Sequence, residues 1–316
     1  MTLHLVSVGS NLVDALSAPS GISGLDPDLA DAIRDESPAR VLSDTVGSDN
    51  QAAAVELGAC LSPGTDQHRY LAQLTQAVKP GLWPSGISAE LDTLTRVPGG
   101  RRHLAAGSTS NDVAVLLATD TVDGLTAALW NALALTEGDL DRVEYLPSPA
   151  ELPSAPRGRA LVVRVPGLDA HTEGDFTRAM EGLGTLGRTL VTKVADSGDE
   201  DFLFHLSGGY KAAVPYLIGL AEGLRSLRRT GTVQAFMLHR DTLGKPIRLP
   251  LRRMRIEVLH EVLHPFRETG KTPCSPGNDV LEGYAYDLTD SGDYELTAFG
   301  AGLLALIGRP EEPLGL

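Results

Sequence analysis

The sequence has few cysteines, few aromatic residues and no hydrophobic run long enough to cross a membrane. Its two cysteines, Cys60 and Cys274, lie far apart and have no CxxC partner, which argues against a disulfide framework or a zinc knuckle and suits a reduced compartment. Thr or Asn interrupts the longest apolar runs, such as residues 125–135. The opening residues 1–9 carry no basic leader. We therefore expect a cytoplasmic protein that does not associate with membranes.

Positive charge is also scarce. Lys and Arg number 27 against 41 Asp and Glu, so the formal net charge is −14. This charge opposes long-range attraction to a nucleic-acid backbone or an anionic membrane, so an anionic ligand has to be held by local groups. Hydrophobic residues at 42% and charged residues at 22% are typical of a soluble globular protein. A length of 316 residues exceeds one ordinary core and predicts two domains.

Predicted strands and helices alternate along the first 257 residues. Strands are predicted over residues 2–8, 112–118, 142–146, 160–165, 201–206, 232–239 and 247–256. Helices are predicted over residues 51–61, 67–78, 122–135, 173–195 and 212–227. This alternation predicts a Rossmann-like, doubly wound α/β domain over residues 1–257.

The pattern changes in residues 258–316. A helix, a Pro/Gly turn, a hairpin over residues 284–296 and a helix over residues 298–307 predict a small winged-helix-like domain. Residues 261–316 hold 10 acidic and 3 basic residues, which is a poor surface for phosphate contacts. DNA is therefore not an expected partner of this domain.

Small and polar residues follow three of the predicted strands. They are Gly9, Ser10 and Asn11, then Thr119, Asp120 and Thr121, and finally Ser207, Gly208, Gly209, Tyr210 and Lys211. Ligands of doubly wound sheets bind beyond the carboxyl ends of the strands, so we expect the three loops to converge on one edge. Gly-Gly allows close backbone approach, and the N–H groups of the next helix with Lys211 form a local anion site that suits a phosphate diester.

These loops also have simpler interpretations. The glycine spacing matches neither GxxxxGK[ST] nor GxGxxG, which argues against a nucleotide triphosphatase or a dinucleotide-dependent dehydrogenase. Gly-Gly can form a tight strand-to-helix turn, and each of the other two loops alone can be a cap or a turn. Lys211 favours the anion site, because a cation in the first turn of a helix opposes the helix dipole unless an anion compensates it.

Several segments resemble the CRISPR-associated Rossmann-fold (CARF) family, in its branch of ring nucleases and standalone sensors. LVSVGSNLVDAL resembles the strand followed by G-T-S-L-L, and DVAVLLATDTVDGLTAAL resembles the S-D-T segment. FHLSGGYKAAVPYLIGLA resembles N-x-T-G-G-x-K-A-x-x-P-Y-L, the most specific of the matches. The resemblance extends over most of residues 1–257.

The resemblance implies a homodimer with a two-fold pocket for a cyclic oligoadenylate, the second messenger of type III CRISPR antiviral defence, with cyclic tetra-adenylate as the expected ring. It implies a ring nuclease without cofactor or metal, in which a ribose 2′-hydroxyl attacks the adjacent phosphate. Lys211 would stabilise charge, Ser10 and Asn11 would position the reacting groups, and Asp120 and Thr121 would shape the base or ribose pocket. Asn11 stands where the family has serine, and the hydroxyl of Ser10 lies one residue earlier.

Three alternatives remain open from the sequence. The first is a sensor without enzymatic activity that acts through its C-terminal domain. The second is a zinc protease, because His260, Glu261 and His264 fit HExxH. Against it, Pro265 follows directly, and the apolar spacing leaves the three polar residues on a solvated helix face. The third is the R-x4-H ribonuclease motif at Arg255 and His260, which lacks the longer helical domain it needs.

Overall fold

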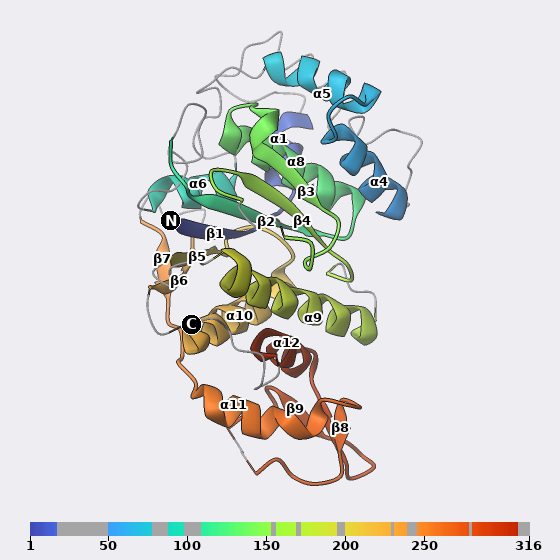
Figure 1. Ribbon diagram of the computed structural model, residues 1–316, viewed down its shortest axis with the longest axis vertical. Helices are drawn as coiled ribbons and strands as arrows, with labels where there is room; N and C mark the ends of the chain where they lie inside the picture. Colours follow the sequence, from blue (N-terminus) through green and yellow to red (C-terminus); the bar gives the residue numbers. More distant parts are fainter. Residues whose placement is uncertain are drawn as a thin grey trace.

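A seven-stranded, mostly parallel sheet forms the centre of the computed structural model (Figure 1). The structure describes residues 1–17, 50–77, 88–97, 109–152, 156–168, 172–194, 200–228, 231–238, 245–277 and 280–308. The strands are β1 (Thr2–Ser7), β2 (Val113–Thr119), β3 (Val143–Leu146), β4 (Ala160–Val165), β5 (Asp201–His205), β6 (Val233–Met237) and β7 (Ile247–Leu249). Their order is β3-β4-β2-β1-β5-β6-β7, and only the β6–β7 pair among them is antiparallel. The predicted Rossmann-like α/β fold is therefore confirmed.

Strand β7 is shorter than the sequence predicted. The expected strand over residues 247–256 ends at Leu249. Pro250 follows, and it has no N–H to donate to a neighbouring strand. Residues 251–255 have no regular structure, and a helix begins at Ile256.

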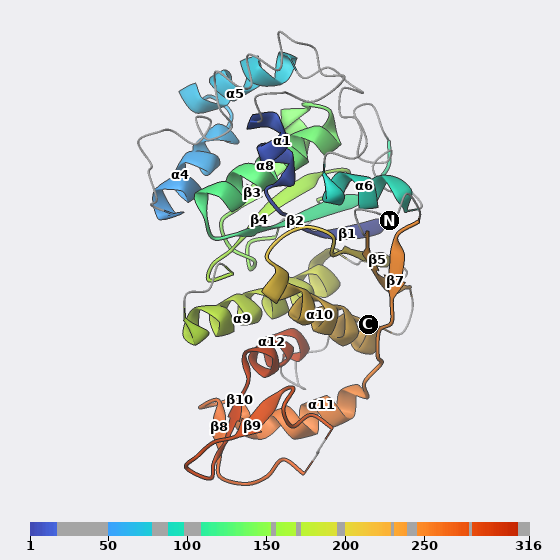
Figure 2. The same cartoon turned by 180° about the vertical axis from the view of Figure 1, so that it is seen from behind.

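Helices cover both faces of the sheet (Figures 1 and 2). One face carries α1 (Asn11–Ser17), α4 (Asn50–Cys60), α6 (Ala89–Arg96) and α8 (Val122–Thr136), with α5 (Asp66–Ala77) packed on α4. The other face carries α9 (Glu173–Thr189), continued by the π-helical turn η2 (Leu190–Val194), and α10 (Val214–Leu227). Alternate residues of β1 explain this arrangement, because Leu3 and Leu5 belong to one apolar core and Val6 to the other.

The C-terminal segment contains a second, smaller sheet. Its elements are α11 (Ile256–Leu263), η4 (His264–Phe266), β8 (Lys271–Thr272), β9 (Tyr286–Leu288), β10 (Tyr294–Leu296) and α12 (Ala298–Ile307). The strands are antiparallel in the order β8-β10-β9, so the predicted hairpin and final helix are confirmed. A winged helix is not confirmed, because most of α12 is buried and so is not presented as a recognition helix.

Helix α12 packs against α9 and α10, which themselves cover the sheet (Figure 1). Glycines permit this close approach: a Cβ on Gly184 of α9 would overlap the carbonyl oxygen of Gly302 in α12. A Cβ on Gly219 of α10 would likewise overlap the ring of Phe299. The C-terminal segment thus shares one apolar core with one face of the large sheet.

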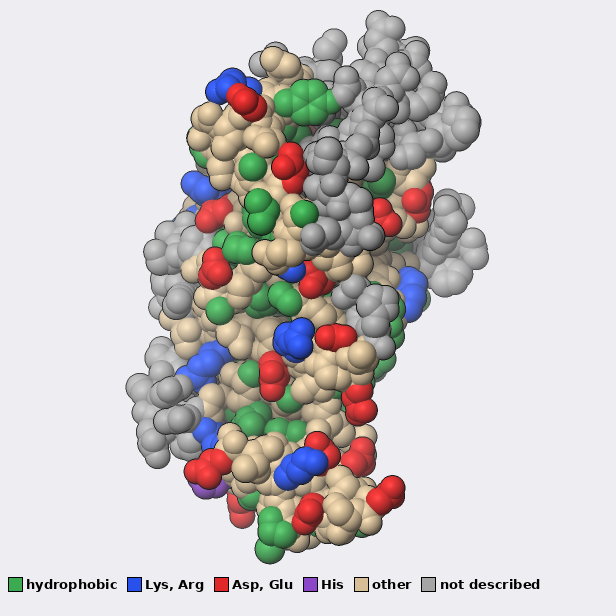
Figure 3. All heavy atoms as spheres, turned by 90° about the vertical axis from the view of Figure 1, so that its right-hand side faces the viewer, with side chains coloured by type: hydrophobic (Ala, Val, Ile, Leu, Met, Phe, Trp, Pro, Cys, Tyr) green, Lys and Arg blue, Asp and Glu red, His purple; other side chains and the backbone are tan. Residues whose placement is uncertain are grey.

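Charged side chains are dispersed on the visible surface. In Figure 3, Lys and Arg lie among Asp and Glu and do not gather into a broad basic patch on the face shown. Among the residues described, no helix is both long and apolar enough to cross a bilayer.

Candidate functional site

The sheet has a topological switch point between β1 and β5. The chain leaving β1 enters α1 on the α8 face, whereas the chain leaving β5 passes through the 3-10 turn η3 (Lys211–Ala213) into α10 on the α9 face. Ligands of doubly wound sheets bind at such a point, where the connections of two parallel neighbours leave in opposite directions. The β1 loop (residues 9–11) and the β5 loop (residues 207–211) lie at this point. The β2 loop (residues 119–121) lies at the same edge, since β2 is the other parallel neighbour of β1.

The β1 and β5 loops touch each other through glycines. A Cβ on Gly9 would lie 2.7 Å from the backbone nitrogen of Gly209, and Gly209 itself has φ +85°. The hydroxyl of Ser7 donates to the carbonyl oxygens of Gly208 at 2.7 Å and His205 at 3.2 Å. The glycines therefore form a tight junction between the two loops, as in the tight-turn interpretation of the Gly-Gly motif.

Glu90, in the first turn of α6, places a carboxylate in this junction. The backbone N–H of Gly9 donates to Glu90 Oε1 at 2.7 Å, and the hydroxyl of Ser88 donates to Oε2 at 2.7 Å. A Cβ on Gly208 would overlap this carboxylate. Only 1% of Glu90 is exposed. Burial raises the pKa of Glu90 above its ordinary value, although the hydrogen bonds from Ser88 and Gly9 and the charge of Lys211 oppose that rise.

Glu90 is not among the residues expected at this edge, because the sequence pattern did not predict a helix over residues 89–96. A local signal for the helix was present: Ser88 is the N-cap, its hydroxyl accepts from the N–H of Leu91 at 3.2 Å, and Leu91 and Leu94 share the i, i+3 spacing of a buried face. No local pattern in the sequence indicates that Glu90 contacts Gly9, which lies 81 positions earlier in the chain.

Buried polar side chains pack next to the β5 loop. The hydroxyl oxygens of Thr93 in α6 and Ser207 lie 2.6 Å apart, and Ser207 Oγ accepts from the N–H of Leu238 at 2.8 Å. In the neighbouring strands β1 and β5, Nδ1 of His4 and Nε2 of His205 lie 3.0 Å apart. Complete burial, and then the charge of His4, hold the pKa of His205 well below its usual range, so this imidazole is neutral at neutral pH.

The predicted catalytic side chains lie in the β1 and β5 loops, next to this junction. Lys211 is exposed, with Nζ 3.5 Å from the carbonyl oxygen of Ser207, and its neighbour Tyr210 is 41% exposed. Ser10 and Asn11 are also exposed, and the hydroxyl of Ser10 donates to Asp14 Oδ2 at 2.8 Å. Solvent can thus reach the lysine, the hydroxyl and the amide next to the buried carboxylate.

An ion pair with β4 and a helix cap hold the β2 loop. Arg164 Nε donates to Asp120 Oδ1 at 2.6 Å, and both side chains are largely buried. Thr121 Oγ1 accepts from the N–H of Gly124 at 3.0 Å and caps α8, while Thr119 Oγ1 lies 3.0 Å from Thr121 Oγ1. The cap interpretation therefore holds for Thr121. Arg164 is a partner that the sequence analysis missed, although a lone charge inside the apolar segment ALVVRV was a signal for it.

A cavity of about 710 Å³ lies away from the glycine junction, along the edge strand β3. Its wall includes Gly58 and His68 from the α4–α5 side, Tyr145 of β3 and Arg164 of β4. Burial raises the pKa of Tyr145 to about 12, so its phenol is protonated at neutral pH. Through Arg164, which pairs with Asp120, the cavity adjoins the β2 loop.

The HExxH residues do not form a compact cluster with further ligands. Helix α11 ends at Leu263, and the Pro265 that follows belongs to η4. Glu261 and His264 are exposed, as the spacing predicted, and Nδ1 of His260 lies 3.5 Å from Arg267. Partial burial and the charge of Arg267 lower the pKa of His260. Within the described ranges, no group of three or more His, Cys, Asp or Glu could hold a metal ion.

The fold and this edge of the sheet define a Rossmann-like α/β protein in which two glycine-containing loops meet at the switch point. No protein-family model matches the chain, and no curated protein matches it in sequence.

Proposed function

We propose that the protein binds a cyclic oligoadenylate at the β1–β5 switch point and cleaves it to linear products as a metal-independent ring nuclease of the CARF type. The observation that carries the proposal is the carboxylate of Glu90 on the N–H of Gly9, beside Gly208. The junction between the two loops already holds a carboxylate oxygen on a backbone N–H, in the way that it would hold an oxygen of a bridging phosphate.

The donors around this junction suit one phosphate diester at a time. The N–H of Gly9 belongs to the β1 loop and the ammonium of Lys211 to the β5 loop, and the face shown in Figure 3 has no broad basic patch. Small clusters of this kind bind a compact ligand and do not favour a long nucleic acid. In a homodimer the same groups would occur twice around the two-fold axis and would match a symmetric ring.

Cleavage requires the ribose 2′-oxygen in line with the bond that breaks. A bond forms between the 2′-oxygen and phosphorus, the bond from phosphorus to the 5′-oxygen breaks, and the 2′-hydroxyl proton is transferred to the leaving oxygen. Lys211 would stabilise the charge that develops on phosphorus-bound oxygens, and Asn11 would donate its amide N–H to one of them. Ser10, oriented by its hydrogen bond to Asp14, would position the 2′-hydroxyl.

The test is incubation with cyclic tri-, tetra- and hexa-adenylate in EDTA, with retention and products followed by chromatography. We expect linear products from the wild type, their loss in Lys211→Ala, and no change in Lys271→Ala. Lys271 is a matched control because it is an exposed lysine of β8, paired with Glu295 at 3.0 Å. If no ring is bound or cleaved, the proposal is wrong.

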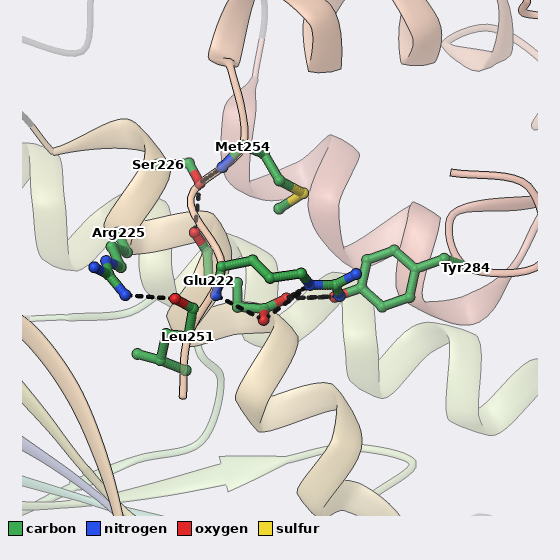
Figure 4. A network of polar contacts seen from close by, with 7 residues as sticks. Glu222, Arg225, Ser226, Leu251, Met254 and Tyr284 are labelled. Carbon is green, nitrogen blue, oxygen red and sulfur yellow. Dashed lines mark hydrogen bonds and ion pairs between the residues drawn. The ribbon is translucent and has the colours of Figure 1, made fainter. Parts of the chain in front are cut away.

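A second candidate function is a sensor that transmits binding to the C-terminal segment. Helix α10 follows the β5 loop directly, and its Glu222 holds that segment (Figure 4). Arg252 Nε lies 3.0 Å from both oxygens of Glu222, and the hydroxyl of Tyr284 donates to Oε2 at 2.9 Å. The guanidinium of Arg252 also lies 4.5 Å from the ring centroid of Tyr284. Burial works to raise the pKa of Glu222, but these hydrogen bonds lower it, so the network keeps its charge.

The sensor candidate predicts binding of an intact ring and a changed rate of hydrogen exchange in α11 and β8–β10. The prediction of a winged-helix-like C-terminal domain is part of this second proposal. Both candidates include a homodimer in the cytoplasm. Light scattering after size-exclusion chromatography would test the homodimer.

A further inference from the structure

We infer that Glu90 is an internal competitor for the anion site, so that a phosphate binds there only when the Glu90 carboxylate leaves its place or takes up a proton. The inference rests on the proposed function, because it concerns the regulation of the same site. Glu90 thereby acts as a gate that controls access of the phosphate to the site.

Competition follows from shared space and a shared donor. A backbone N–H has one hydrogen, and that of Gly9 is directed at Glu90 Oε1 at 2.7 Å. The space that the missing Cβ of Gly208 leaves open is filled by the same carboxylate. A phosphate approaching these two glycines would face a negative charge at contact distance in a buried setting, where repulsion is weakly screened.

A lysine and neutral hydrogen-bonding groups act on the Glu90 carboxylate. Lys211, from the β5 loop, is the positive charge that acts on it. Helix α8 contributes the neutral Asn131, whose side-chain oxygen accepts from Ser88 at 3.0 Å. Helix α6, to which Glu90 belongs, also carries Thr93, whose hydroxyl oxygen lies 2.6 Å from that of Ser207 in the β5 loop. An incoming phosphate would therefore compete with Glu90 for Lys211 as well as for the N–H of Gly9.

Protonation offers a route by which both groups can remain. Burial works against the charged form of Glu90, so the proton is easier to add here than on an exposed glutamate. A protonated carboxyl group can donate its O–H to a phosphoryl oxygen, which turns a repulsive neighbour into a hydrogen-bond donor. Binding of the phosphate should then be accompanied by proton uptake, and the affinity should fall as the pH rises.

The test compares the wild type with Glu90→Gln and with Glu257→Gln as the control. Gln keeps an acceptor for the Gly9 N–H and removes the charge and the titration. Glu257 is an exposed residue of α11, so its substitution makes the same chemical change outside the junction of the β1 and β5 loops. Calorimetry with cyclic tetra-adenylate from about pH 6 to about pH 8, in two buffers of different ionisation enthalpy, gives the affinity and the protons taken up.

For the wild type and Glu257→Gln we expect proton uptake and an affinity that falls by up to about tenfold per pH unit. For Glu90→Gln we expect tighter binding at about pH 8 and no proton uptake. An unchanged affinity and pH slope in Glu90→Gln would overturn the inference. If the variant does not fold, Glu90→Asp serves instead, because its shorter side chain withdraws the carboxylate from Gly9 and should also bind more tightly.

The failure of the proposed function has a different signature. If cyclic tetra-adenylate binds to neither the wild type nor Glu90→Gln, the same titrations are made with inorganic pyrophosphate. Tighter binding of pyrophosphate to Glu90→Gln than to the wild type would support the gate and leave only the choice of ligand wrong. No difference between the two proteins with pyrophosphate would overturn the gate as well.

Discussion

Replacement of Gly208 by alanine should destabilise the protein even without a ligand. The new methyl group would occupy the space that the Glu90 carboxylate fills. Gly208, unlike Gly209, does not have a positive φ, so the cost arises from this overlap and not from backbone strain. The carboxylate would be forced away from the N–H of Gly9 and from Ser88.

The size of the effect follows from the contacts that are lost. A buried donor left without its partner costs about 1–3 kcal/mol, and overpacking in a well-packed interior costs about 1–3 kcal/mol. We therefore expect Gly208→Ala to lower the free energy of unfolding by about 2–6 kcal/mol. Gly58→Ala in α4 is the control: its Cβ would lie 3.7 Å from the Tyr145 ring, which is an ordinary contact, and the change should be neutral or stabilising.

Urea unfolding followed by circular dichroism measures both variants, and a double-mutant cycle isolates the cause. In Glu90→Ala the carboxylate is absent, so Gly208→Ala should cost less there, with a coupling energy of about 0.5–3 kcal/mol. A Gly208→Ala variant within about 0.5 kcal/mol of the wild type would refute the packing argument. Additive effects in the double variant would refute the assignment to Glu90.

Three further predictions concern other parts of the structure. Arg252→Ala should lower the free energy of unfolding by about 2–3 kcal/mol in urea titrations, because it leaves the buried Glu222 without its charged partner, and a loss below about 0.5 kcal/mol would contradict this. Because the pKa of His205 is depressed in the folded protein, the unfolded state takes up a proton at a higher pH than the folded state does. The free energy of unfolding should therefore fall as the pH drops below the ordinary value of 6.5, by up to about 1.4 kcal/mol per pH unit. The variant His205→Asn should flatten this slope. An unchanged slope in that variant would assign the pH dependence to other groups. Gly184→Ala should push α12 away from α9, because its methyl group meets the carbonyl of Gly302, and we expect a cost of about 1–3 kcal/mol with faster hydrogen exchange in α12; unchanged exchange there would contradict the close packing.

Much of the secondary structure was predictable from the sequence. The apolar segments gave β1 to β6 within one or two residues, and the final hairpin and α12 were also anticipated. The error at β7 had a local cause, since Pro250 ends the strand that apolar spacing alone would have continued. The helix predicted from residue 212 begins as the 3-10 turn η3 and becomes α-helical at Val214.

The sequence by itself determined most of the strands and helices and which polar residues follow the strands, because the spacing of apolar side chains is a local property of each segment. The tertiary structure alone decided the strand order and hence the switch point between β1 and β5. It also decided that Glu90 lies on the N–H of Gly9 and that α12 lies against α9. These arrangements depend on contacts between residues distant in the chain, and no short stretch of sequence contains both partners.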